Sequence, residues 1–176
     1  MPNHVRNVIK FKNLKPDDIA MILNTLATEI PDRPDINYAI DFDKIIPEPR
    51  TIEDCPEDCR VTEKSHIVKD EDRDWFDWYA WHNKYWGTKW NAYDCYSIIG
   101  KSFVTFVFST AWSYPEPIID RLHLLGYDIE YRYAEEDWGS NCGRMTYTSE
   151  QGWETQDEYT GLPHPEQFAK RLWDRY

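Results

Sequence analysis

The stretch of sequence that decides the fold is WNAYDCYSIIGKSFVTFVFSTAWSYPEPIIDRLHLLGYDIEYRY, residues 90–133. Its pattern predicts two strands joined by a tight turn at Gly100-Lys101, then a helix that ends at Gly126, then a third strand. The predicted elements cover residues 90–99, 103–112, 117–125 and 127–133. Alternation along the second strand places Phe108 and Trp112 on one face, and we expect both side chains in the core.

Two elements before this stretch complete the pattern. Residues 3–12 alternate between apolar and polar side chains, as a half-buried strand does. Residues 16–30 carry apolar side chains at helical spacing and are followed by Pro31, which predicts a helix. The order strand, helix, strand, strand, helix, strand predicts an α+β fold of the ferredoxin-like βαββαβ type. In this fold both helices cover one face of an antiparallel sheet.

The remaining segments are predicted to be additions to one domain that spans residues 1–176. Residues 31–90 form an irregular insertion rich in acidic and aromatic residues, and residues 143–176 form a C-terminal extension. The insertion is expected to contain a short strand over residues 39–46 and an aromatic helix over residues 75–86. The extension is expected to contain a hairpin over residues 143–160, turning near Gln151-Gly152, and a last helix from Pro165 onward.

The charge balance limits the class of partner. The chain has 176 residues and a formal charge of −12, from 32 acidic and 20 basic side chains. Such an excess disfavours nonspecific binding to DNA, RNA or anionic membranes, which needs positive surface, and it suits a basic partner. No apolar run reaches about 18 residues and no signal-peptide core follows Met1, so we expect a soluble cytoplasmic protein.

The segment WFDWYAWHNKYWGTKW, residues 75–90, holds five of the nine tryptophans. So dense a cluster either organises the core or builds a binding face. As a binding face, its tryptophans would stack on a planar ligand while Lys89 neutralises a phosphate. The candidate pocket residues are Trp86, Gly87, Thr88, Lys89, Trp90, Asn91, Thr110 and Trp112. His82 has no acid or nucleophile partner nearby in sequence and is typical of a hydrogen-bonded core residue.

Acidic side chains gather in three runs, EDCPED, DEDRD and AEED. Their spacing matches neither an EF-hand loop nor a familiar catalytic template, so they are predicted to be solvated loop faces. Together they would form the surface that contacts a basic partner. This predicted acidic face consists of Glu53, Asp54, Glu57, Asp58, Asp70, Glu71, Asp72, Asp74, Glu135, Glu136 and Asp137.

The sequence offers no clear metal site or catalytic constellation. Cys55, Cys59 and His66 allow a zinc interpretation, but their spacing is atypical and a second cysteine pair is missing, so reduced thiols are favoured. No Walker loop, GxSxG or HExxH motif occurs. We therefore predict no metal, no cofactor and no catalytic residue, and a protein that is not an enzyme.

Four blocks resemble a known family. They are PNHVRNVIKF, FDKIIPEP, YWGTKWNAYD and FSTAWSYPEPII, at residues 2–11, 42–49, 85–94 and 108–119. In this order they are similar to the YubB-type family, which phages and plasmids encode and which has a ferredoxin-like domain. The start at Pro2, the CPEDC segment and the tail from about Gln151 look particular to this chain. The resemblance implies a ferredoxin-like fold and a mobile-element origin, and it implies no activity.

Two classes of function follow from these observations. The first is a non-enzymatic interaction protein that occupies a basic surface of a host nucleic-acid-binding defence machine, such as a CRISPR effector or a restriction enzyme. Such an anti-CRISPR or counter-defence protein would act as a DNA mimic, through charge complementarity. The second is a small-ligand or nucleotide-binding protein that uses the tryptophan-lined pocket. Salt dependence discriminates between them, because salt screens charge mimicry much more than aromatic stacking.

Overall fold

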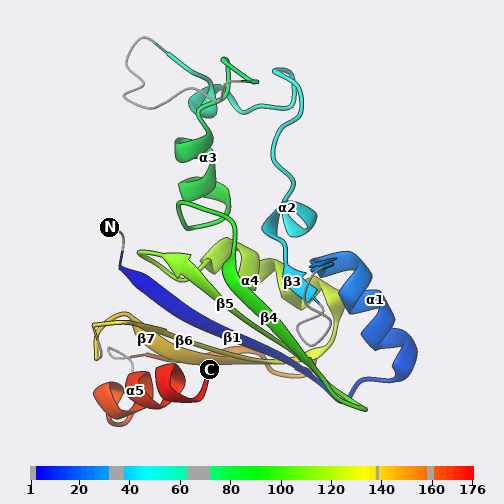
Figure 1. Ribbon diagram of the computed structural model, residues 1–176, viewed down its shortest axis with the longest axis vertical. Coiled ribbons are helices and arrows are strands. Elements are labelled where there is room, and N and C mark those ends of the chain that lie inside the picture. Colours follow the sequence, from blue (N-terminus) through cyan, green and yellow to red (C-terminus); the bar gives the residue numbers. More distant parts are fainter. Residues whose placement is uncertain (1–2, 32–37, 63–71, 138, 158–160) are drawn as a thin grey trace.

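The structure is a computed structural model that describes residues 3–31, 38–62, 72–137, 139–157 and 161–176. Its centre is a six-stranded antiparallel sheet in the order β4-β5-β1-β6-β7-β8 (Figure 1). The strands are β1 (His4–Lys12), β4 (Tyr93–Ile99), β5 (Val104–Ala111), β6 (Asp128–Glu135), β7 (Cys142–Thr148) and β8 (Gly152–Asp157). The register of β4 on β5 shifts between Tyr93 and Tyr96, which makes a bulge in this edge strand.

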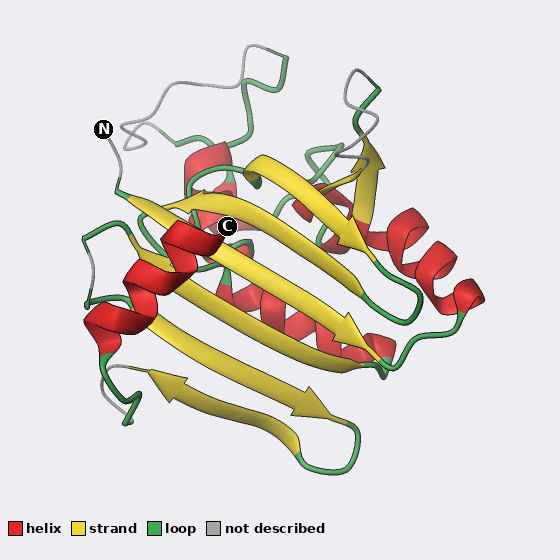
Figure 2. Cartoon of the chain, turned by 60° about the horizontal axis from the view of Figure 1, so that its bottom comes forward, coloured by secondary structure: helices red, strands yellow, loops and turns green. Residues whose placement is uncertain are grey.

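Four of these strands and two helices form the predicted ferredoxin-like fold. β4 and β5 are paired neighbours, as expected, and β1 lies between β5 and β6. The helices α1 (Pro16–Leu26) and α4 (Glu116–Leu122) pack on one face of the sheet, and η2 (His123–Leu125) continues α4 (Figure 2). The predicted topology is therefore confirmed, and apolar alternation along β1 and β6 marks the face that these helices bury.

The C-terminal part of the chain covers the other face of the sheet. The hairpin of β7 and β8 extends the sheet beyond β6, and α5 (Pro165–Arg175) lies across the face opposite α1 and α4 (Figure 2). Ala169 and Leu172 of α5 pack with Val8 of β1 in a second core cluster. With both faces covered, β5 is buried along its whole length.

Trp112 departs from this pattern, and the prediction that it is a core residue is wrong. Its side chain is 42% exposed, whereas Phe108 is fully buried. Trp112 follows the last residue of β5 and has a φ of +70°, a left-handed conformation that is uncommon outside glycine. This change of backbone direction interrupts the strand alternation, so the indole leaves the core face.

The helix predicted over residues 16–30 is shorter than expected. α1 ends at Leu26, and the next residues form β2 (Ala27–Glu29), which pairs with β3 (Tyr38–Ile40). The β-branched Thr28 suits a strand, and the pairing with β3 satisfies backbone groups that a longer helix would have used. A local apolar spacing cannot indicate this pairing, because the partner strand lies further along the chain.

The strand predicted over residues 39–46 is wrong beyond Ile40. A short helix, α2 (Phe42–Ile45), occupies this position. The Asp41 carboxylate accepts a hydrogen bond from the backbone N–H of Asp43 at 3.1 Å and so caps the helix. The aspartate cap therefore favours a helix in this segment, although its apolar residues alone favoured a strand.

The chain between α2 and β4 stands out from the sheet as an arm, which comprises the described residues between 46 and 91 (Figure 1). It contains η1 (Glu57–Cys59) and α3 (Trp78–Tyr85). Aromatic residues provide its small core, in which Phe76 and Trp81 are buried and lie edge to face. None of the helices in the described ranges has both the length and the apolar character that a membrane crossing requires.

The ends of α3 have clear causes. The helix starts at Trp78 instead of Trp75 because the Asp77 carboxylate accepts a hydrogen bond from the backbone N–H of Ala80 at 3.0 Å. After the helix, Gly87 has a φ of +75°, the left-handed conformation expected of the residue that stops a helix. Gly87 therefore ends α3.

Candidate functional site

The two sequence blocks predicted to form a site do lie side by side. The Thr88 hydroxyl donates a hydrogen bond to the Ala111 carbonyl oxygen at 2.9 Å and accepts one from the Ala111 N–H at 3.1 Å. The Ser113 hydroxyl donates to the Gly87 carbonyl oxygen. These bonds join the base of the arm to the end of β5, and they hold the two blocks in a fixed relation.

Several of the predicted pocket residues are structural instead. The side chains of Trp86, Thr88 and Thr110 are buried and are 2%, 1% and 0% exposed. Gly87 has no room for a side chain, because a Cβ atom there would lie 2.7 Å from Cδ of Pro117. The Asn91 side chain accepts a hydrogen bond from the Phe42 N–H at 2.9 Å and is therefore committed to holding α2. The three buried side chains are therefore closed to solvent, and that of Asn91 is engaged within the protein.

The other three predicted residues form a partly exposed cluster with Tyr79 of α3. We call this cluster the aromatic platform, and its members are Tyr79, Lys89, Trp90 and Trp112. The Lys89 ammonium lies 4.6 Å from the ring centre of Trp90, 5.2 Å from that of Trp112 and 6.0 Å from that of Tyr79. Trp90 is 38% exposed and Trp112 is 42% exposed. The platform thus presents aromatic surface to solvent around a central cation.

Tyr79 was absent from the predicted site. Its ring meets the Trp112 ring edge to face, with the centres 6.4 Å apart. Helical spacing in the sequence places Tyr79 on the same stripe as Trp86, but it cannot indicate that the end of β5 approaches this stripe. The left-handed backbone of Trp112 brings the two rings together, and no sequence signal reports that conformation.

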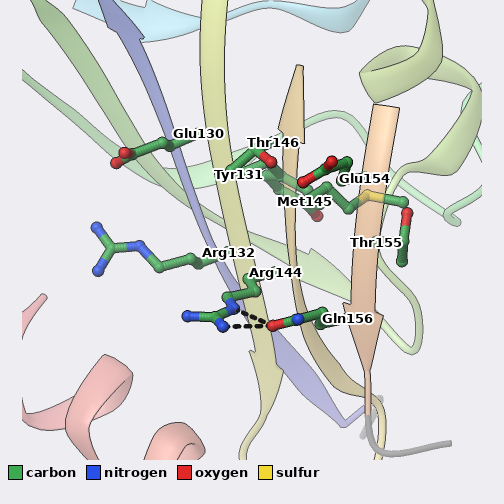
Figure 3. Close-up of a pocket in the computed structure, with 9 residues that line it drawn as sticks. All are labelled: Glu130, Tyr131, Arg132, Arg144, Met145, Thr146, Glu154, Thr155 and Gln156. Atoms are coloured by element: carbon green, nitrogen blue, oxygen red, sulfur yellow. Dashed lines mark hydrogen bonds between the residues drawn. The ribbon is translucent and has the colours of Figure 1, made fainter. Parts of the chain in front are cut away.

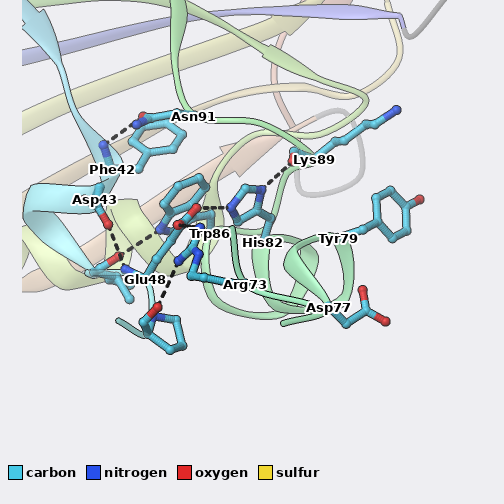
Figure 4. A network of polar contacts seen from close by, with 12 residues as sticks. Phe42, Asp43, Glu48, Arg73, Asp77, Tyr79, His82, Trp86, Lys89 and Asn91 are labelled. Atoms are coloured by element: carbon cyan, nitrogen blue, oxygen red, sulfur yellow. Dashed lines mark hydrogen bonds and ion pairs between the residues drawn. The ribbon is translucent and has the colours of Figure 1, made fainter. Parts of the chain in front are cut away.

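A polar network behind the platform holds the Lys89–Trp90 segment in place (Figure 4). His82 Nδ1 lies 2.8 Å from the Lys89 carbonyl oxygen, and His82 Nε2 lies 2.6 Å from Glu48 Oε1. The His82 ring is stacked on Trp86, with the ring centres 4.0 Å apart. His82 is therefore a hydrogen-bonded core residue, as predicted, and it positions the backbone from which Lys89 projects.

Glu48 is the anion of this network. Its second oxygen, Oε2, lies 2.7 Å from the Arg73 guanidinium, which also donates to the Pro49 carbonyl oxygen. Burial alone would raise the pKa of Glu48, but hydrogen bonds and charges from His82 and Arg73 lower it to about 2. The carboxylate therefore stays ionised at neutral pH and ties three segments of the arm together.

The predicted acidic residues lie on different elements of the fold. Glu53, Asp54, Glu57 and Asp58 are exposed near η1 on the arm, where Asp58 Oδ2 lies 2.6 Å from the Lys84 ammonium. Asp72 and Asp74 are exposed further along the arm. Asp70 and Glu71 lie outside the described residues. The acids at 135–137 sit elsewhere, at the end of β6.

Residues 135–137, which we call the acidic turn, lie beside the platform. The Asn3 amide nitrogen donates to Glu135 Oε1 at 2.5 Å and to Asp137 Oδ2 at 3.1 Å, and the Asn3 carbonyl oxygen accepts the N–H of Trp112 at 2.9 Å. Asn141 donates to the Trp112 carbonyl oxygen at 3.0 Å. Carboxylates and exposed indoles therefore share one end of the sheet.

The cysteines of the zinc alternative are buried in the arm. Cys55 Sγ lies 3.5 Å from the Cys59 carbonyl oxygen. Burial, together with the Asp58 carboxylate, raises the pKa of the Cys59 thiol to about 11, and burial raises the pKa of the Cys55 thiol. Both are free, buried thiols. The predicted third member, His66, lies outside the described residues.

A comparison with protein families gives a match over half of the chain, which includes three of the four platform residues. A family model described as "Ferredoxin-like domain in Api92-like protein" matches residues 85–173. The chain belongs to this family. The matched range begins at the end of α3 and includes Lys89, Trp90, Trp112 and the acidic turn, while Tyr79 and the acids of η1 precede it. No curated protein and no solved structure gave a match.

Proposed function

We propose that this Api92-like domain is a non-enzymatic interaction protein that binds an arginine-rich, basic protein surface through the aromatic platform and the acidic turn. The observation that carries the proposal is the exposure of Trp90 and Trp112 around a cation, next to carboxylates. Tryptophan and tyrosine supply much of the binding energy at protein interfaces, so exposing them here suits contact with a partner.

The chemistry of the platform favours arginine as the partner residue. Lys89 already places a cation over the aromatic rings of the free protein, so the rings are arranged to hold positive charge. An incoming guanidinium would replace Lys89, stack on an indole and pair with Glu136 or Asp137, which are both exposed. The net charge of −12 would attract such a surface over a longer range.

The biological setting that we propose follows the YubB-type resemblance. The chain would be encoded by a phage or plasmid and act in the cytosol of the host cell. Its target would be a nucleic-acid-binding defence machine, a CRISPR effector or a restriction enzyme, whose basic channel accepts a polyanion. Occupying that channel would make the chain a DNA mimic with an anti-CRISPR or counter-defence role, without binding nucleic acid or a membrane itself. The support for this target is the charge and the resemblance.

A second candidate function uses the same platform. Trp90 and Trp112 would stack on the base of a nucleotide, and Lys89 would neutralise its phosphate. The close approach of these three side chains favours this candidate. The two candidate functions differ in what they require of Lys89. A partner guanidinium competes with Lys89, whereas a phosphate requires it.

Exchanging Lys89 for glutamine separates these functions. If the chain binds a basic surface, Lys89→Gln should strengthen capture of proteins from a bacterial lysate at low salt, because it removes the competing cation. Trp112→Ala should weaken capture at least about tenfold, as loss of an interface anchor does. Leu124→Ala, at an exposed apolar position at the other end of β6, is the matched control and should have no effect.

The contrary results are equally specific. Capture that is insensitive to Trp112→Ala and to added salt would contradict binding through the platform and the acids. Loss of AMP binding in Lys89→Gln, with no basic protein captured by the parent, would favour the nucleotide-binding function instead.

A further inference from the structure

A groove on the α5 face of the sheet gathers arginines in an otherwise acidic protein. Arg132 of β6 and Arg144 of β7 reach it from the sheet, and Arg171 and Arg175 reach it from α5. The groove encloses about 400 Å³ and adjoins a second cavity of about 730 Å³, which Arg132 and Arg144 also line. We call this the arginine groove. It lies on the opposite face of the sheet from α4.

The strand register sets two of these cations directly against each other. Arg132 and Arg144 are paired positions on β6 and β7, so their side chains leave the same face side by side. Figure 3 shows both side chains extending from the strands toward the same side. Like charges at directly opposed positions destabilise a sheet. Arg171 and Arg175 repeat the arrangement at a spacing of four residues on α5, where like charges also repel.

Neutral groups, not carboxylates, hold the guanidinium groups of the sheet. Arg144 donates from Nε to Gln156 Oε1 at 2.7 Å, and Arg132 donates to the Tyr176 hydroxyl at 3.2 Å. Arg132 and Arg175 both lie over the Tyr176 ring. Within the described ranges, no carboxylate is at ion-pair distance from any of the four arginines. Among the described residues, none of these four positive charges is therefore in a direct ion pair.

The acids that line the larger cavity form no direct ion pair with these arginines, although the charge of Arg132 acts on Glu130. Glu130 Oε1 lies 2.8 Å from the Lys12 ammonium, and the Lys12 hydrogen bond lowers the pKa of Glu130. Figure 3 shows Glu130 and Glu154 toward one end of the cavity and Arg132 and Arg144 toward the other. Arg132 and Arg144 also line the smaller cavity, so the two cavities meet at this second end.

We propose that the arginine groove binds the phosphate group of a small phosphorylated ligand. Planar guanidinium groups match phosphate oxygens with paired hydrogen bonds, and a bound dianion would relieve the repulsion between Arg132 and Arg144. Both cavity volumes fall in the range of about 300–1,000 Å³ that is typical of small-molecule sites. Phe168 and Tyr176 line the smaller cavity and supply apolar surface for the rest of the ligand.

A small ligand fits better than a nucleic acid polymer. The chain as a whole carries a charge of −12, which repels a long polyanion beyond the groove. A single phosphorylated molecule would meet mainly the local positive charge. This site is separate from the platform, so it does not depend on the function proposed above.

Calorimetric titration of the full chain with ADP, inorganic pyrophosphate and adenosine tests the assignment. ADP should bind, and adenosine should bind at least about tenfold more weakly, because it lacks the phosphate. Arg144→Gln and Arg171→Gln should each weaken ADP binding about tenfold or more. Arg121→Gln, at an exposed position on α4, removes the same charge outside the groove and should leave the affinity unchanged.

Comparing pyrophosphate with ADP shows which part of the ligand the groove recognises. Equal affinity for pyrophosphate and ADP would assign the groove to the phosphate group alone, and tighter binding of ADP would assign it to a nucleotide.

Without ligand, Arg144→Gln should melt at the same temperature as the parent or higher, because it removes one of two facing cations. Equal binding of adenosine and ADP, unchanged ADP affinity in both groove variants, or preference for a single-stranded oligonucleotide would each overturn the proposal. Trp112→Ala should bind ADP normally, which keeps this test separate from the platform.

Discussion

Replacing Trp86 with alanine should lower the free energy of unfolding by about 3–5 kcal/mol, the usual cost of truncating a buried large aromatic. Trp86 is 2% exposed and lies edge to face with Phe42 and Trp81. Its indole N–H also donates to the Ile46 carbonyl oxygen at 2.9 Å. The substitution would therefore leave both a cavity and an unpaired carbonyl group between the arm and the sheet. Urea unfolding followed by circular dichroism measures the loss.

The matched substitution is Trp112→Ala, which should cost only about 1–2 kcal/mol because the side chain is 42% exposed. Both variants remove an indole from the same region, so the difference between them reports burial. Equal losses for the two variants would contradict the exposure of Trp112 and would return it to the core. A loss below about 1 kcal/mol for Trp86→Ala would show that the arm contributes little to the stability of the domain.

Acidification should remove a second large contribution to stability, that of Glu48. Its pKa in the folded protein is about 2, against an ordinary value of 4.5. Since the pKa is lowered by folding, the ionised carboxylate stabilises the folded state fully above about pH 4.5, and this contribution disappears as the pH falls toward about 2. The shift corresponds to about 3 kcal/mol. The side chain is 13% exposed, so solvent screens the interaction little.

Comparing the parent with Glu48→Gln across this pH range isolates the contribution. At neutral pH the variant should be less stable by about 3 kcal/mol, and the two unfolding free energies should converge between about pH 4.5 and 2. Glu53→Gln, at an exposed position of the same arm, should follow the parent throughout. A constant difference between the parent and Glu48→Gln at every pH would contradict the stabilisation of the Glu48 carboxylate by its contacts with His82 and Arg73.

The fold was predictable from the sequence because its determinants are local. Apolar alternation in residues 3–12 and 127–133, and the turn at Gly100-Lys101, each specify an element without reference to the rest of the chain. Ala27–Glu29 could not be assigned in this way, since its strand depends on pairing with Tyr38–Ile40. Elements that need a distant partner were missed for this reason.

The candidate site was predictable only in part, for a related reason. The sequence indicated that Lys89, Trp90 and Trp112 belong together, and they do lie together. It could not indicate that Thr110 is buried between β1 and the turn after β5, where its hydroxyl donates to the Ser113 carbonyl oxygen and accepts from Asn7. The arginine groove was missed altogether, because the register of β6 on β7, and not any motif, brings Arg132 and Arg144 together.

The bulge in β4 has a consequence for solubility. An edge strand offers unpaired N–H and C=O groups on which a strand of another molecule can assemble, and β4 exposes Ile98 and Ile99 at this edge. The register shift after Tyr93, with the left-handed Asp94 inside it, breaks the regular spacing of those groups. An invading strand would find only a short straight template, too short for stable cross-β stacking. Straightening this edge would therefore expose the chain to aggregation while leaving its core intact.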